Sequence, residues 1–146
     1  MTTKKMNNIS LKLEKSDFNS VKISKSQDAY NCIKAFYQDD ISLYESFFIL
    51  LVDRKNCTTG YVKISQGGTA GTVVDPKIVA KYAIDSLCAG VILAHNHPSG
   101  NLLPSEADNA ITRKIRDGLR LFEINTLDHL IMTEEGFHSY ADNGEI

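Results

Sequence analysis

The sequence predicts a single domain of mixed α/β class. Its 146 residues are close to the usual size of one compact domain, and a hydrophobic fraction of 42% is enough for one core. Apolar runs at 47–52 and 90–94 alternate along the chain with amphipathic segments at 76–87 and 105–119. This alternation is typical of helices packed on a sheet, and no repeat or linker divides the chain.

Hydrophobic periodicity and turn residues locate the individual elements. In the first half of the chain we expect a half-exposed strand at 21–23, a helix capped by Ser26 and reaching Phe36 or Tyr37, strands at 45–53 and 58–65, and a flexible glycine loop at 67–71. A helix from Pro76 to about Leu87 and a strand buried on both faces at 90–94 should follow. We then expect a loop at 96–104, a helix from Ser105, and strands at 124–133 and 137–141.

Residues 1–19 are rich in Lys, Ser and Asn and are expected to form a loose arm before one domain over 20–146. No stretch approaches the roughly 20 apolar residues that cross a bilayer. The first 15 residues contain no apolar signal-peptide core. We therefore expect a cytoplasmic protein without a membrane partner.

Composition excludes several classes of site and partner. Three scattered cysteines without a CxxC pair predict neither a disulfide framework nor a cysteine zinc site. The net charge of −2 argues against strong electrostatic capture of nucleic acid. One cluster leaves a weak nucleic-acid association open, although a solvated helix face is its more usual meaning: Arg113, Lys114, Arg116 and Arg120.

The residues that carry chemistry follow the strand at 90–94. His95 and His97 are two apart on an extended chain, so both side chains leave the same face and can reach one ion. The end of a strand is also where open α/β sheets usually place their sites. Asp108 is expected on the first turn of the next helix, facing back toward the strand. Two imidazoles and one carboxylate leave the fourth position of a tetrahedral zinc open, as in catalytic sites.

Each half of this stretch also has a purely structural interpretation. A lone His-x-His pair more often belongs to a surface or to packing than to a metal. Ser105 at a helix N-cap with Asp108 three residues later forms a capping box that suits the helix dipole. The capping box does not explain two histidines on the same side of a strand end.

A site that activates water also needs a general base, and Glu45 is the candidate. It opens the apolar run at 47–52, where a buried carboxylate is costly without a partner; a solvated strand end is the competing interpretation. His129 could be a third imidazole ligand or a partner of a ligand, although a hydrogen-bonded, partly buried histidine is the more common role. His138, beside a turn, is expected to face solvent.

These residues resemble a known family. The string His95-Asn-His-Pro98, six residues, Ser105, two residues, Asp108 resembles the JAMM signature of MPN-domain metalloproteases. The resemblance is to the RadC subfamily in particular, covers about residues 26–146, and includes Ile92–Gly100 with Pro104-Ser105, Glu45 with Asp53, Gly68-Thr69, Leu127–Ile131 and Ser139–Gly144.

The resemblance implies a cytidine-deaminase-like α/β/α fold with a mixed sheet, the JAB/MPN fold. It implies zinc (Zn2+) on His95, His97 and Asp108, with Glu45 activating the water. Ser105 would help to hold the tetrahedral oxyanion. The implied reaction is hydrolysis of a peptide or isopeptide bond in a peptide or protein substrate.

Two departures and two alternatives qualify this expectation. Full-length RadC proteins carry an N-terminal helix-hairpin-helix module that the short arm is not expected to supply, and the subfamily's Pro-Arg-Glu is replaced by Pro76-Lys77-Ile78. The alternative function is a non-catalytic protein- or DNA-interaction module associated with DNA repair. An HNH nuclease is disfavoured because its residues are dispersed along a motif. The sequence leaves homo-oligomer formation open through exposed strand edges.

Overall fold

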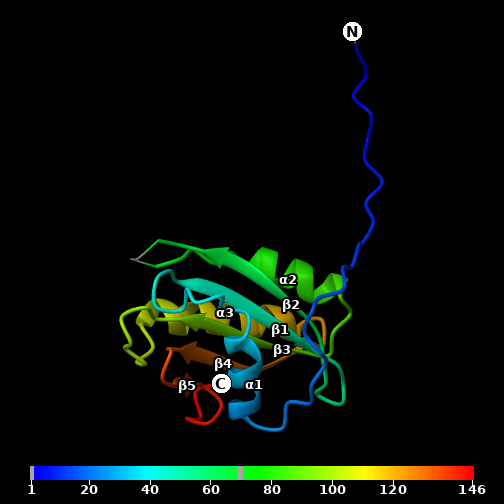
Figure 1. The fold of residues 1–146 in the computed structure, drawn as a ribbon. Coiled ribbons are helices and arrows are strands. Elements are labelled where there is room, and N and C mark those ends of the chain that lie inside the picture. Colours follow the sequence, from blue (N-terminus) through cyan, green and yellow to red (C-terminus); the bar gives the residue numbers. More distant parts are fainter. Residues whose placement is uncertain (1, 69–70) are drawn as a thin grey trace.

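A five-stranded sheet forms the centre of the fold in the computed structural model, which describes residues 2–68 and 71–146 (Figure 1). The strand order is β2-β1-β3-β4-β5. Only β3 and β4 are parallel, and every other neighbouring pair is antiparallel, so the sheet is mixed as expected. The strands are β1 (Ser46–Val52), β2 (Thr58–Gln66), β3 (Gly90–Asn96), β4 (Asn125–Met132) and β5 (Phe137–Ser139).

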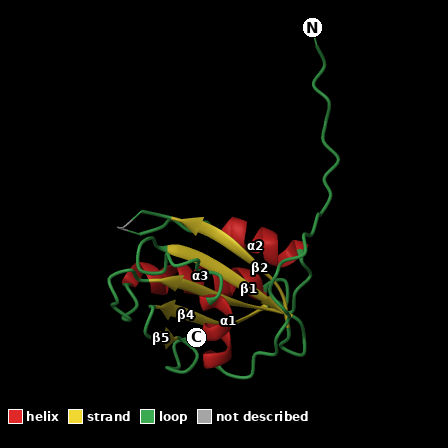
Figure 2. Ribbon diagram, in the orientation of Figure 1, coloured by secondary structure: helices red, strands yellow, loops and turns green. Residues whose placement is uncertain are grey.

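Three helices cover the two faces of this sheet (Figure 2). Helix α1 (Ser26–Lys34) packs on the face that carries Phe48 and Leu50 of β1. Helices α2 (Pro76–Asp85) and α3 (Glu106–Arg120) pack on the opposite face, against Phe47 and Ile49 of the same strand. Alternate residues of one strand therefore enter two cores, which confirms the predicted α/β/α layering.

Strand β3 shows why its sequence is apolar throughout. It lies between β1 and β4, and all seven of its residues are buried. It ends at Asn96, so His95 and Asn96 belong to the strand rather than to the following loop. A parallel strand can follow only after a crossover, and α3 makes that crossover to β4. The crossover begins at the strand end that carries the histidines.

Two expectations near the start of the domain are wrong. The segment at 21–23 is not a strand, because it makes a single bridge, from Lys22 to Cys57. Ser26 is the first helical residue of α1 rather than its cap. The carboxylate of Asp28 instead accepts hydrogen bonds from the backbone N–H groups of Ser24 (2.9 Å) and Lys25 (3.2 Å). Local carboxylate capping thus replaces the predicted serine cap.

The arm at 2–19 contains no helix or strand and leads away from the body of the domain (Figure 1). Its last part is held by Phe18, whose ring lies 5.1 Å from that of Phe36 and 5.6 Å from that of Tyr61. Within the described residues, no helix combines the length and the apolar character needed to cross a membrane. The three cysteines are free.

Candidate metal centre

The end of β3 presents its side chains to both layers of helices. His95 lies directly opposite Phe47 of β1, which belongs to the core under α2 and α3. The backbone N–H of His97 donates to the carbonyl of Met132 (3.0 Å), which extends the pairing with β4 by one residue. Since side chains alternate along a strand, His95 and His97 face α3, while Asn96 faces the α1 layer.

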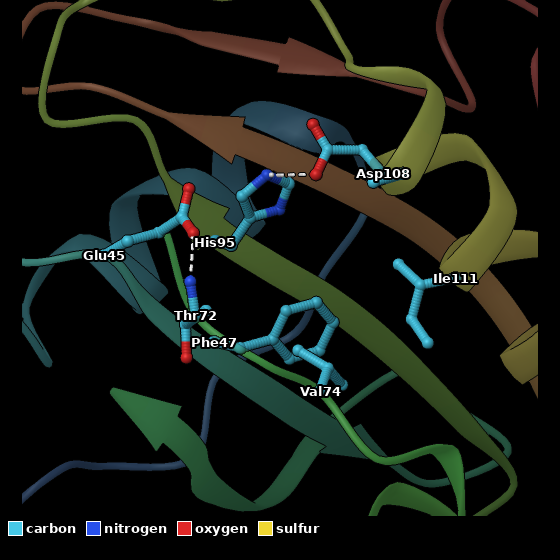
Figure 3. Close-up of a pocket in the computed structure, with 8 residues that line it drawn as sticks. Glu45, Phe47, Thr72, Val74, His95, Asp108 and Ile111 are labelled. Atoms are coloured by element: carbon cyan, nitrogen blue, oxygen red, sulfur yellow. Dashed lines mark hydrogen bonds and ion pairs between the residues drawn. The ribbon is translucent and has the colours of Figure 1, made fainter. Parts of the chain in front are cut away.

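Four polar side chains meet beside this strand end. The Nε2 atoms of His95 and His97 lie 3.0 Å apart. The carboxylate of Asp108 lies 3.2 Å from Nε2 of His95 and 3.4 Å from Nε2 of His97. The Oε1 atom of Glu45 lies 4.0 Å from Nε2 of His97. Figure 3 shows Glu45, His95 and Asp108 pointing toward one another from the chain before β1, from β3 and from α3.

Two three-residue ligand sets share the two histidines. Potential ligand atoms of Glu45, His95 and His97 all lie within 4.8 Å of one another. Asp108 lies closer to both imidazoles than Glu45 does to His97. One oxygen of each carboxylate also accepts a backbone N–H group, so the shorter distances alone make Asp108 the nearer candidate for the third ligand.

Asp108 combines the two roles that its position suggested. Its Oδ2 atom accepts a hydrogen bond from the N–H of Ser105 (2.8 Å), and Oγ of Ser105 accepts one from the N–H of Asp108 (3.0 Å), which is a complete capping box. Burial alone would raise the pKa of Asp108, but the facing imidazoles of His95 and His97 hold this pKa well below its usual range. Asp108 is therefore ionised where it faces the two imidazoles.

Glu45 is held by the loop that precedes α2. The N–H of Thr72 donates to Oε2 of Glu45 (2.7 Å), which leaves Oε1 facing His97. The preceding residue, Gly71, has φ = +130°, a conformation that side-chain-bearing residues rarely adopt. Gly71 therefore allows the loop to point the N–H group of Thr72 toward the carboxylate of Glu45. Thr69, quoted in the family resemblance, lies outside the described residues.

The side chain of Asn96 forms hydrogen bonds with the backbone on both sides of Glu45. Its Nδ2 atom donates to the carbonyls of Tyr44 (2.7 Å) and Ile41 (2.6 Å), and its Oδ1 atom accepts from the N–H of Ser46 (2.8 Å). The side chain is completely buried. Both peptide groups that flank Glu45 are thus fixed to the strand that carries the histidines.

Replacing Asn96 with aspartate is expected to lower the free energy of unfolding by about 3 kcal/mol or more, because two donated hydrogen bonds are lost and a charge is buried against carbonyl oxygens. Urea denaturation measures this change. The exposed Asn31, changed to aspartate in the same way, is the control and should alter stability by less than about 0.5 kcal/mol. An Asn96→Asp protein as stable as the control would contradict the stabilising role of the hydrogen bonds that Asn96 makes around Glu45.

His129 lies behind the site rather than on it. It is completely buried, and its Nε2 atom lies 2.7 Å from Nδ1 of His95. Its Nδ1 atom lies 2.6 Å from Oγ1 of Thr112 in α3. Burial holds the pKa of His129 well below its ordinary value. The expected hydrogen-bonded histidine is thus found, in contact with His95 and more deeply buried than expected.

The remaining polar residues of the sequence analysis lie as follows. Ser105 is exposed at the start of α3 and caps it. His138 does not simply face solvent, because its Nε2 atom lies 2.7 Å from a carboxylate oxygen of Glu145 and its side chain is 19% exposed. Of the four basic residues, Arg116 is half-buried and pairs with Asp117. The other three are exposed: Arg113, Lys114 and Arg120.

The affinity of this site for a metal is expected to fall as the pH falls. The hydrogen bond with Asp108 raises the pKa of His97 above its ordinary value, although burial opposes the rise. Protons therefore compete with a metal for His97 at a higher pH than at an ordinary histidine. Below the raised pKa, the affinity for a divalent metal should drop about tenfold per pH unit. Chelator competition between about pH 5 and 8 measures this, and a flat profile would contradict it.

A small cavity of about 180 Å³ adjoins the polar cluster. Polar residues line one part of it, namely Glu45, Thr72, His95 and Asp108, and apolar side chains line the rest (Figure 3). It is smaller than the pockets of roughly 300–1,000 Å³ that enclose drug-sized ligands. The cavity therefore suits one small group next to the polar cluster. Its apolar lining comes from Phe47, Val74, Ala107 and Ile111.

Comparison with known proteins places the chain in a family. The family model described as RadC-like JAB domain matches residues 23–145. A UPF0758 protein of Flavobacterium johnsoniae is 38% identical over 123 residues, which are 84% of this chain and 53% of that protein.

UPF0758 proteins of Alcanivorax borkumensis and Cellvibrio japonicus are 40% and 41% identical, over 70% and 68% of this chain and 46% and 45% of their own lengths. The chain thus spans about half the length of these relatives. The family match covers most of the chain and includes every residue of the polar cluster, so the chain belongs to the RadC-like JAB domain family.

Proposed function

We propose that this domain is a zinc-dependent hydrolase of peptide- or isopeptide-type amide bonds. The observation that carries the proposal is the meeting of two imidazole Nε2 atoms and two carboxylates at one strand end. Family membership supports it, since the JAB domain is a metal-dependent hydrolase-type fold.

The donor set fits zinc on chemical grounds. Nδ1 of His97 lies 2.6 Å from the carbonyl of Asn101, and because a carbonyl only accepts, a neutral His97 carries its proton at Nδ1. Its Nε2 lone pair then faces the polar cluster. Two imidazole nitrogens and the ionised Asp108 would bind zinc and leave a position for water. Zinc bound there would lower the pKa of a water molecule to about 7 and polarise a carbonyl.

The side chains around that position suit amide hydrolysis. Oε1 of Glu45 would take a proton from the attacking water and return it to the leaving nitrogen. Because Oε2 accepts a hydrogen bond from the N–H of Thr72, the side chain of Glu45 is held in one orientation for both proton transfers. Ser105 accepts a hydrogen bond from Asp108, so its own hydroxyl proton is free to donate to a developing oxyanion. A small aliphatic group of the substrate would enter the apolar part of the cavity.

The test is a cleavage screen with zinc-loaded protein against a peptide library and a set of isopeptide-linked peptides, read by mass spectrometry. We expect cleavage that a chelator abolishes and added zinc restores. A protein that binds zinc but cleaves nothing in either set would favour the non-catalytic interaction module. In that case the carboxylate of Glu45 would face the histidines without acting as a base.

A further inference from the structure

A chain of buried hydrogen bonds leads from α3 to His95. It starts at the backbone carbonyl of Asp108, to which Oγ1 of Thr112 donates (2.6 Å). The same Oγ1 atom lies 2.6 Å from Nδ1 of His129, and Nε2 of His129 lies 2.7 Å from Nδ1 of His95. Thr112, His129 and His95 are 2%, 0% and 3% exposed, so water does not compete for these bonds.

The position of each proton follows from the first bond. A carbonyl can only accept, so the single hydroxyl proton of Thr112 points to Asp108. Thr112 must then accept the Nδ1–H of His129, which leaves the lone pair of a neutral His129 at Nε2. That lone pair accepts the Nδ1–H of His95. The lone pair of His95 is therefore at Nε2, the atom that lies 3.0 Å from Nε2 of His97.

The ring of His129 is fixed in the orientation that this chain requires. It stacks on Tyr140 with 4.9 Å between ring centroids and an interplanar angle of 15°. Its edge meets Phe47, with centroids 5.6 Å apart at 66°. The hydroxyl of Tyr140 donates in turn to Oδ1 of Asn109 in α3 (2.8 Å). Packing from β1, α3 and the chain after β5 thus holds both ring nitrogens on their partners.

We propose that Thr112 and His129 are positioning residues that fix the Nδ1–H tautomer of His95 and so prepare its Nε2 atom to bind the metal. They act through His95 and are not ligands themselves. This rests on the metal-binding part of the proposed function and is independent of the substrate. If the hydrogen bonds ran in the opposite direction, Nε2 of His95 would carry a proton and would have no lone pair to bind a metal.

The tautomer of His95 is read directly by long-range 1H–15N correlation NMR of the imidazole nitrogens in the metal-free protein, at about pH 9, where ordinary imidazoles are neutral. We expect a protonated Nδ1 and an unprotonated Nε2. A His95 with its proton at Nε2 in the wild-type protein would overturn the proposal without any need for a variant.

Variants of Thr112 test the consequence for metal binding. Thr112→Val keeps the side-chain shape but removes the acceptor for His129, so the Nε2–H form of His95 should appear and zinc affinity should fall about 10–100-fold. Thr112→Ser restores the hydroxyl and should stay within about threefold of wild type. Thr126→Val is the matched control, because the hydroxyl of Thr126 is buried without a hydrogen-bond partner.

Competition with a chromophoric chelator measures the affinities. A Thr112→Val protein with wild-type zinc affinity would overturn the proposal, as would a Thr112→Ser protein as weak as Thr112→Val. A wild-type protein that binds zinc tightly yet cleaves no amide would overturn only the proposed hydrolysis. A wild-type protein that binds no zinc would overturn both.

Discussion

Replacing Glu45 with glutamine is expected to reduce the rate of amide hydrolysis by a factor of about 100–10,000 while zinc remains bound. Glutamine keeps the shape of the side chain and can still accept the hydrogen bond from Thr72. It cannot take a proton from water. Turnover of whichever peptide the screen identifies, together with zinc content, measures the two parts of this expectation.

Glu135→Gln is the control, because Glu135 is exposed in the turn between β4 and β5 and is not one of the four residues of the polar cluster. It should leave turnover and zinc content unchanged. Unchanged turnover in Glu45→Gln would refute the role of Glu45 as the base. Loss of zinc in that variant would instead make Glu45 a ligand, in the alternative set with His95 and His97.

Replacing Asp108 with asparagine is expected to lower zinc affinity more than about 100-fold while the helix keeps most of its stability. The amide oxygen can still accept the hydrogen bond from Ser105, so the cap should lose only about 0.5–1 kcal/mol. The negative charge that faces both imidazoles is lost. Chelator competition and urea denaturation separate the two effects.

Asp75→Asn makes the same chemical change at another cap. The carboxylate of Asp75 accepts the N–H of Lys77 at the start of α2 and is exposed. It should change stability by a similar amount without changing zinc affinity. If Asp108→Asn and Asp75→Asn bound zinc equally well, Asp108 would be a helix cap and not a ligand.

The metal-ligand candidates were accessible from the sequence because they depend on local geometry. Alternation along one strand places His95 and His97 on one side, and one turn of a capped helix places Asp108. Their convergence then needs only the loop at 97–105. Glu45 is 50 residues away from His95, and it reaches the site because Phe47 pairs with His95 across β1 and β3. Sequence indicated the strand but not its register.

The supporting residues were missed for different reasons. The contact from Thr72 to Glu45 depends on a loop conformation with positive φ at Gly71, which no periodicity predicts. Asn96 was detectable in principle, since an amide between two inward-facing histidines must point into the opposite, apolar layer and find partners there. Thr112 gave no signal, because a threonine on an amphipathic helix is ordinary until its neighbour is known to be His129.

We propose that the domain holds one zinc ion on His95, His97 and Asp108. Metal content by elemental mass spectrometry, with purified wild-type and His97→Ala proteins side by side, tests it most directly. We predict about one zinc per chain in the wild type and a loss of zinc in the variant, with both proteins folded. Absence of zinc from both proteins after dialysis against zinc, or equal zinc in both, would contradict the assignment.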